Sequence, residues 1–145
     1  MKFFLALTTL LAAAFMLAAA DNAASGVSYV EKDKVDGFLA KGGTMIKGSD
    51  FAVQGTHRVK PGRVEIHVKE TDVFYVTDGS ATVVTGGIVV NQKESRPGQI
   101  GGDSIDGGQT FHISKGDVMT IPAGVPHWFK ETTGVSYYVV KVIKP

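Results

Sequence analysis

Short segments in which apolar and polar residues alternate follow one another through most of the chain. They are rich in Val, Ile, Thr, Phe and Tyr, and the 18 glycines, all after residue 20, separate them. Alternation with a period of two predicts strands, and glycine at this spacing predicts the turns between them. The nine predicted strands cover residues 49–54, 64–70, 72–77, 81–85, 88–90, 109–113, 117–121, 127–130 and 136–142. The pattern therefore indicates an all-β fold, a barrel or a sandwich.

Two segments depart from this alternation. Val35, Phe38 and Leu39 form one apolar stripe within residues 31–41, which predicts a short helix packed outside the strands. Residues 91–108 hold five glycines and one proline with little periodic apolar content, so we predict a long loop or lid there.

Three dipeptides predict turns. Asp78-Gly79 lies between two β-rich runs, and both residue types tolerate the positive φ of a tight hairpin turn. Pro61-Gly62 and Lys115-Gly116 are also typical of turns.

The first twenty residues have the features of a secretory signal peptide. Lys2 precedes an apolar stretch over residues 3–17, and three alanines follow, ending at Ala20. A membrane-spanning helix needs about 20 apolar residues, and this run is shorter and ends in small residues. We expect cleavage after Ala20, secretion or a periplasmic location, no membrane attachment after cleavage, and one domain over residues 21–145.

Composition limits the chemistry further. The net charge is +1 at pH 7 and neither sign of charge forms a run, so nothing indicates nucleic acid as a partner. Because the chain has no cysteine, nitrogen and oxygen atoms must supply any metal ligands.

Two carboxylates and a histidine are predicted to share one face of neighbouring strands. Glu65 and His67 point the same way by alternation, as do Asp72, Phe74 and Val76. If that face is the barrel interior, a divalent cation is the simplest partner for the carboxylates, since unpaired charge in an apolar interior costs several kcal/mol. Glu-x-His suits the solvated face of a strand equally well.

A second segment favours the metal interpretation. Pro122, Gly124 and Pro126 bend the chain between two predicted strands and place His127 at the start of the second.

These residues resemble the two motifs of the cupin superfamily. The second motif, G-x5-P-x-G-x2-H-x3-N, fits at Gly116, Pro122, Gly124 and His127, with Glu131 in place of the asparagine.

The first motif, G-x5-H-x-H-x(3,4)-E-x6-G, fits less closely. His67 and Gly79 match it, whereas Glu65 replaces the first histidine, Asp72 replaces the glutamate, and the leading glycine appears as Gly62, three residues late.

The resemblance implies a double-stranded β-helix barrel with one mononuclear metal site. The implied ligands are Glu65, His67, Asp72 and His127, and we expect a water to connect the shorter Asp72 to the ion. Two histidines with carboxylate suit Mn(II) or Fe(II), with Zn(II) next. A cupin that has lost its metal is the alternative.

Six further residues are candidates for the pocket. Phe74, Val76, Phe111 and Phe129 would line it, although such residues also make an ordinary barrel core. His57 is a candidate donor at one end of the barrel or a surface residue. His112 enters the site only if its strand presents the opposite face. In the long loop, Lys93, Arg96 and Gln99 are candidates to orient an anionic or hydroxylated ligand.

We therefore predict an exported, metal-dependent enzyme for a small oxygenated substrate. Dioxygenation, isomerisation and lyase chemistry are all compatible with the resemblance, and Glu65 is the candidate for moving a proton. The alternative is a non-catalytic barrel that binds a sugar or a carboxylate. Tyr137 and Tyr138, followed by Val139 and Val140, make both faces of the last strand apolar, which predicts a homodimer.

Overall fold

A computed structural model describes residues 26–145, and the predicted signal peptide at 1–20 lies outside that range. The described part of the chain contains one helix and eleven strands. They are α1 (Lys32–Lys41), β1 (Gly43–Lys47), β2 (Phe51–Arg58), β3 (Val64–His67), β4 (Glu70–Thr85), β5 (Ile88–Val90), β6 (Lys93–Arg96), β7 (Gln99–Gly102), β8 (Ser104–Asp106), β9 (Gln109–Ser114), β10 (Val118–Ile121) and β11 (His127–Ile143). The one helix in this part of the chain is not long and apolar enough to cross a membrane.

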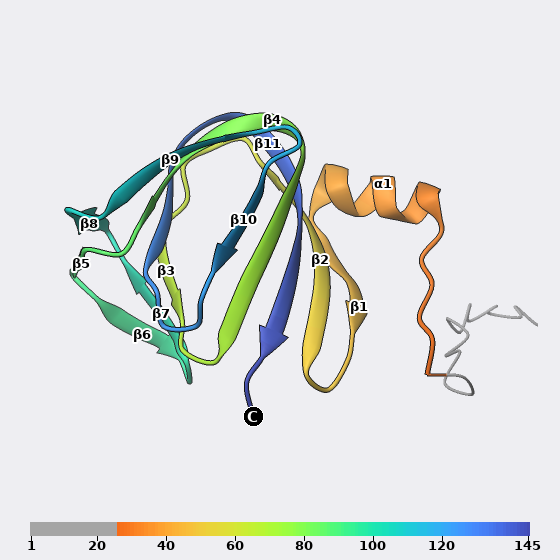
Figure 1. Cartoon of the computed structure of the whole chain (residues 1–145), viewed down its shortest axis with the longest axis horizontal. Coiled ribbons are helices and arrows are strands. Elements are labelled where there is room, and N and C mark those ends of the chain that lie inside the picture. The colour runs from red at the N-terminus through yellow and green to blue at the C-terminus, as the bar shows by residue number, and fades with distance from the viewer. Residues whose placement is uncertain (1–25) are drawn as a thin grey trace, which may run out of the picture.

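Two long antiparallel strands, β4 and β11, form the frame of the barrel. They pair from Glu70 opposite Ile143 to Thr85 opposite His127, with β-bulges along the way. β11 also pairs with β2 and β3, while β4 pairs with β9 and β10. Figure 1 shows these strands surrounding a central space, with α1, β1 and β2 on one side and the short strands β5 to β8 on the other. The prediction of an all-β barrel with one N-terminal helix is confirmed.

Alternation along the strands places aromatic rings in the core. Phe74, Phe129 and Tyr137 are almost fully buried and contact one another, with ring centroids 5.2 to 5.8 Å apart. Burying rings of this size contributes about 2 to 3 kcal/mol each. The same inward face of β4 and β11 continues toward the polar residues described below.

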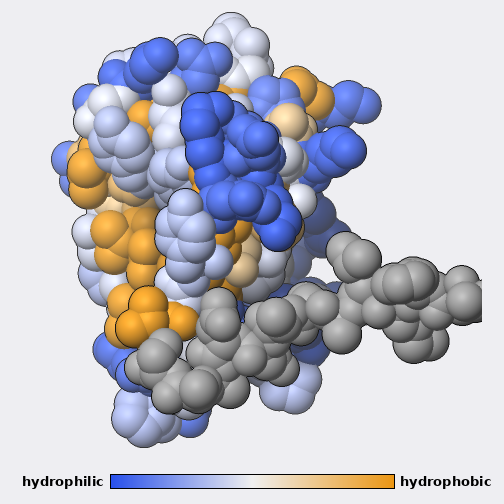
Figure 2. Space-filling model, turned by 90° about the vertical axis from the view of Figure 1, so that its right-hand side faces the viewer, coloured by the Kyte–Doolittle hydropathy of each residue, from blue (hydrophilic) through white to orange (hydrophobic). Residues whose placement is uncertain are grey.

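The helix packs outside the barrel, as its apolar stripe predicted. Phe38 lies against β2 at Gly55, where an added Cβ atom would come within 2.8 Å of the Phe38 backbone. Glycine at this position therefore permits the close approach of helix and strand. Figure 2 views this side of the molecule and shows hydrophobic patches between hydrophilic ones. Phe51 and Val142, paired neighbours on β2 and β11, are among the exposed apolar side chains.

The predicted hairpin at Asp78-Gly79 is wrong. β4 continues through both residues, and Gly79 adopts a φ of 73° within the strand. An added Cβ atom at Gly79 would lie 1.8 Å from the Gly134 carbonyl oxygen on β11. The glycine accommodates a sharp bend and a close strand contact, so the two strands predicted on either side of it are one. The strands predicted at 127–130 and 136–142 likewise form the single strand β11.

The predicted loop at 91–108 is also wrong, because it contains β6, β7 and β8. Every residue of β6 is exposed, so this strand has no apolar alternation to mark it in the sequence. Its backbone pairing with β7, and that of β7 with β3, extends the sheet to an edge. The strand β1 was not predicted either.

Candidate metal centre

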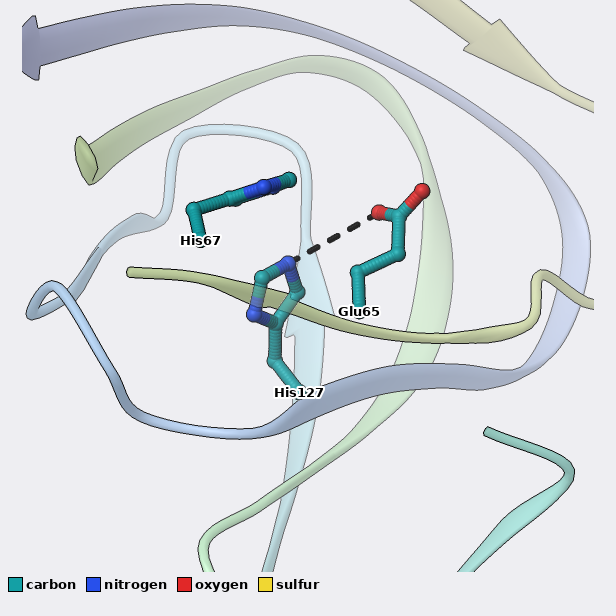
Figure 3. A group of neighbouring side chains, drawn as sticks. All are labelled: Glu65, His67 and His127. Atoms are coloured by element: carbon teal, nitrogen blue, oxygen red, sulfur yellow. Dashed lines mark ion pairs between the residues drawn. The ribbon is translucent and has the colours of Figure 1, made fainter. Parts of the chain in front are cut away.

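Three of the four predicted ligands converge at the junction of β3 and β11. Glu65 and His67 share a face of β3, and His127 at the start of β11 pairs directly with Glu65. One ligand atom from each of the three residues lies within 4.8 Å of the others. Figure 3 shows the carboxylate and the two imidazole rings directed toward a common space. Residues from two strands far apart in the sequence therefore form one candidate site.

The environment of His127 suits a metal-binding nitrogen. The residue is 2% exposed, and its Nδ1 lies 3.4 Å from the carbonyl oxygen of Val125. A hydrogen on Nδ1 leaves the Nε2 lone pair directed at Glu65, whose Oε2 is 3.7 Å away. Burial lowers the pKa of His127, and nearby His67 lowers it further. The neutral imidazole that a metal requires is therefore favoured.

The ring of His67 is oriented by Gln99 from β7. Nδ1 of His67 donates a hydrogen bond to the amide oxygen of Gln99, which leaves Nε2 for the site. The amide nitrogen of Gln99 in turn donates to Glu70 over 3.1 Å. Gln99 thus fixes the tautomer of a candidate ligand and links it to a carboxylate behind the site.

The fourth predicted ligand, Asp72, already has a cationic partner. Its carboxylate is buried and accepts two hydrogen bonds from the Lys141 ammonium, at 2.8 and 3.1 Å. Lys141 Nζ also lies 3.0 Å from Glu70. His67, Glu70 and Asp72 form a second group of ligand atoms within 4.8 Å, and the one Lys141 ammonium pairs with both carboxylates of that group. Nε2 of His67 lies 3.5 Å from Asp72 and joins the two groups.

Arg58 on β2 also contacts Glu65, at the same Oε2 atom that faces His127. Its NH2 lies 3.5 Å from Glu65, and its Nε donates a 2.8 Å hydrogen bond to the Tyr137 hydroxyl. The guanidinium also stacks over the Phe129 ring, 4.8 Å from its centroid. Burial lowers the pKa of Arg58, but Tyr137 and Glu65 more than offset this effect, so its pKa is raised. Arg58 is therefore a fixed cation that orients Glu65.

A cavity of about 940 Å³ opens in front of these residues. Its volume is at the upper end of the range for small-molecule sites. The predicted pocket residues Phe74 and Phe129 line it, and so do Lys93, Arg96 and Gln99.

Four other predicted pocket residues lie elsewhere. Val76 is buried in the core cluster, and Phe111 lines a separate apolar pocket of about 300 Å³. His57 and His112 are exposed, and they form hydrogen bonds to Ser136 (2.8 Å) and Thr82 (3.2 Å). The strand faces that these four present do not line the cavity.

Sequence reasoning missed Arg58, Glu70 and Lys141. A signal existed for Lys141, because it follows Tyr137 and Val139 at a spacing of two and so shares their inward face. The strand predicted at 49–54 stops short of Arg58, whereas β2 extends to that residue. The strand predicted at 64–70 places Glu70 on the face opposite Glu65 and His67, whereas Glu70 begins β4 and shares the face of Asp72.

The residues present fit a divalent ion. Two imidazole nitrogens and a carboxylate oxygen are a common set for Mn, Fe or Zn. Bonds of about 2.0 to 2.2 Å place neighbouring ligand atoms of one ion some 3 to 4 Å apart. The 3.7 Å between His127 and Glu65 agrees with that spacing. The class of protein defined so far is a small β-barrel with residues positioned to form one metal site.

Comparison with known proteins gives the family. The sequence model of the cupin family matches residues 60–144, and this chain belongs to the cupin family. No curated protein matches the sequence significantly.

Solved structures share the fold at low sequence identity. The Bacillus halodurans protein BH2720 is 15% identical, with a TM-score of 0.58 over 84% of this chain and 86% of that chain. Hydroquinone 1,2-dioxygenase from Sphingomonas sp. TTNP3, solved with 4-hydroxybenzoate bound, is 10% identical, with a TM-score of 0.53 over 70% of this chain and 65% of its own. The Schizosaccharomyces pombe Cnp3 cupin domain is 15% identical, with a TM-score of 0.50 over 71% and 60%. These identities support a shared fold only.

Proposed function

We propose that this protein is an exported, metal-dependent enzyme for a small oxygenated substrate, with Glu65, His67 and His127 as the metal ligands. The observation that carries the proposal is the convergence of these three donors on the wall of a cavity large enough for a substrate. A bound divalent ion supplies a Lewis acid or a site for oxygen activation at its open coordination positions. A three-ligand set leaves such positions free.

The donor set favours Mn(II) or Fe(II), with Zn(II) next. Carboxylate oxygen is a hard donor and imidazole suits all three ions, while the chain has no thiolate to select a softer one. Asp72 is a weaker candidate for the fourth ligand than the sequence suggests, because Lys141 already pairs with its carboxylate.

Glu65 is the residue that we propose for proton transfer. Its side chain is 42% exposed, whereas the carboxylates of Glu70 and Asp72 are engaged by Lys141. Of these three carboxylates, the one of Glu65 is therefore the one without a lysine partner. With one oxygen toward His127, the other is available to accept or return a substrate proton. Arg58 would hold the carboxylate in place during that transfer.

Dioxygenation is the first reaction to test, followed by isomerisation and lyase chemistry. The same fold houses the hydroquinone 1,2-dioxygenase, which supports the order of testing and not the assignment itself. An oxygen electrode with Fe(II)-loaded protein and a panel of hydroxylated compounds would detect the first class.

An exchangeable metal-bound water separates an enzyme from a simple binding barrel. We expect Mn(II)-loaded protein to enhance the relaxation of bulk water protons, because ions with open positions exchange water rapidly. His127→Ala should abolish the enhancement at the same Mn(II) concentration, and His112→Ala, an exposed histidine outside the cavity, should leave it unchanged. Bound Mn(II) without any relaxation enhancement would contradict the enzyme proposal and favour a non-catalytic barrel.

Export and dimerisation are further parts of the proposal. If the signal peptide is cleaved as expected, the exported protein begins at Asp21, which N-terminal sequencing would read directly. Tyr137 and Val139 are buried in the core, so a dimer contact would have to use the opposite face of β11, where Tyr138 and Val140 are half-buried. Sedimentation of the mature protein tests this contact, with Tyr138→Lys expected to yield monomers.

A further inference from the structure

Strand pairing brings positive side chains from β6 onto the same face as the candidate metal ligands. Glu65 on β3 pairs with Gly101 on β7, and Gly101 pairs with Lys93 on β6. Directly opposite residues of antiparallel strands project from the same face of the sheet. The candidate ligand Glu65 and the cation Lys93 therefore belong to one row of side chains, and Figure 1 shows β6 at the outer edge of this sheet.

A β-bulge brings a second cation into line with the site. His67 pairs with Gln99, and Gln99 pairs with Arg96. Without the bulge between Glu94 and Arg96, Arg96 would face away from Lys93, because it lies three residues further along the strand. Bulges commonly redirect a side chain next to a functional site.

These cations have no acidic partner in the described part of the chain. Lys93, Arg96 and Arg63 line the cavity, and none of the three forms an ion pair with another residue between 26 and 145. Arg63 directly precedes β3 and lines the same cavity as Glu65.

The four carboxylates that line the cavity have partners other than these three cations. Arg58 faces Glu65, and Lys141 faces Glu70 and Asp72. Glu94 is engaged by the backbone amide of Gly98 over 2.9 Å. The unpaired positive charge of the cavity is thus concentrated on Arg63, Lys93 and Arg96. We call these three residues the rim.

We infer that this rim binds the carboxylate of a small organic acid whose other end carries an oxygen for the metal centre. The inference rests on the proposed function and names the class of its substrate. Guanidinium groups bind carboxylates through paired hydrogen bonds, and a lysine adds a third cation. The row from Glu65 to Lys93 crosses two strand spacings, about 10 Å in all. A free inorganic anion is too small to reach both ends, so the ligand has an organic body.

Gly101 leaves room for that body. It lies between Glu65 and Lys93 in the row and lines the cavity without a side chain. An added Cβ atom there would meet only the Val64 carbonyl oxygen at 3.6 Å and the Lys93 carbonyl oxygen at 4.0 Å, which are ordinary contacts. The fold therefore tolerates a side chain at this position, and such a side chain would occupy the path of the ligand.

The charge test compares acids with their neutral amides. Titration calorimetry on the mature, Mn(II)-loaded protein would use 4-hydroxybenzoate and 3-hydroxybutyrate, each against its amide. We expect the acids to bind more tightly than the amides, and Arg63→Gln, Lys93→Gln and Arg96→Gln each to weaken acid binding by about tenfold. Lys47→Gln, which removes an exposed lysine of β1 outside the cavity, should have no effect. Acid binding that equals amide binding, or an absence of acid binding in the millimolar range, would overturn the inference.

The steric test uses Gly101→Val. We expect this variant to retain its metal and all the rim charges but to lose binding of the acids. Unchanged acid binding would place the ligand elsewhere and overturn the inference. Metal content measured on every sample separates the two proposals. A wild-type protein that holds no metal but still prefers acids to amides contradicts the proposed function and leaves the rim site standing. A wild-type protein that holds its full metal content but does not prefer acids to amides overturns the inference and leaves the proposed function standing.

Discussion

The Lys141 ammonium lies 2.8 Å from Oδ1 of Asp72 inside the barrel. Asp72 occupies the position at which the cupin resemblance implies a metal ligand, so the chain carries its own cation beside that carboxylate. Because Lys141 also pairs with Glu70, one ammonium contacts both carboxylates near His67. The candidate ligands without a lysine partner are then Glu65, His67 and His127.

Replacing Lys141 tests whether its charge stabilises the two carboxylates that it contacts. Lys141→Met should reduce the free energy of unfolding of the metal-free protein by about 3 kcal/mol, because it leaves buried charge uncompensated. Added Mn(II) should stabilise this variant more than it stabilises the wild type, since Asp72 becomes free to bind an ion. Urea denaturation with and without Mn(II) measures both effects.

Lys144→Met is the matched control for that experiment. Lys144 is exposed, and no side-chain contact ties it to the site. If Lys141→Met bound Mn(II) no better than the Lys144→Met control, Asp72 would not be the group that Lys141 withholds from the metal.

Gln99 should affect the metal without touching it. Gln99→Ala removes the acceptor that fixes the tautomer of His67, and we expect the affinity for the metal to fall by about 10- to 100-fold. Competition with a chelator of known affinity measures this change. Gln54→Ala is the control, because Gln54 also lines the cavity but bonds to Thr44. Equal metal affinity in the two variants would show that Gln99 does not position the ligand.

The metal-free protein should lose stability as the pH falls below about 6.5. The pKa of His127 is lowered in the folded state from an ordinary value of 6.5, mainly by burial. The unfolded chain therefore binds more protons at this residue, and the contribution of His127 to stability is present above pH 6.5 and lost below it. Denaturation with a chelator present at pH 7.5 and 5.5 measures the difference. His127→Gln should reduce this difference in stability, whereas the control His112→Gln should leave it unchanged. If both variants kept the full difference, His127 would not be its cause.

Much of the barrel could be predicted because alternation reports burial directly. The inward face of β4, with Asp72, Phe74 and Val76, follows the period of two that the sequence shows. The errors arose where backbone pairing decides the structure. β6 has no apolar face, and the bend at Gly79 depends on the close approach of Gly134, which lies far away in the sequence.

The sequence predicted which side chains converge in the candidate site, but not the cations that pair with its carboxylates. Glu65, His67 and His127 stand in motif positions, so their convergence could be expected. The pairing of Lys141 with Asp72 joins residues on two strands, and only the register of β11 against β4 brings them together. A sequence motif records the residues that bind a metal, but it does not record a distant cation that competes for one of them.

The metal content of the exported protein tests the central claim most directly. Elemental analysis would be made on protein purified without chelators, together with Glu65→Ala, His67→Ala, His127→Ala and Asp72→Asn. The account predicts about one Mn, Fe or Zn per chain in the wild type and in Asp72→Asn, and little or none in the other three variants. A wild-type protein that is folded, free of metal and unaffected by added divalent ions would contradict it.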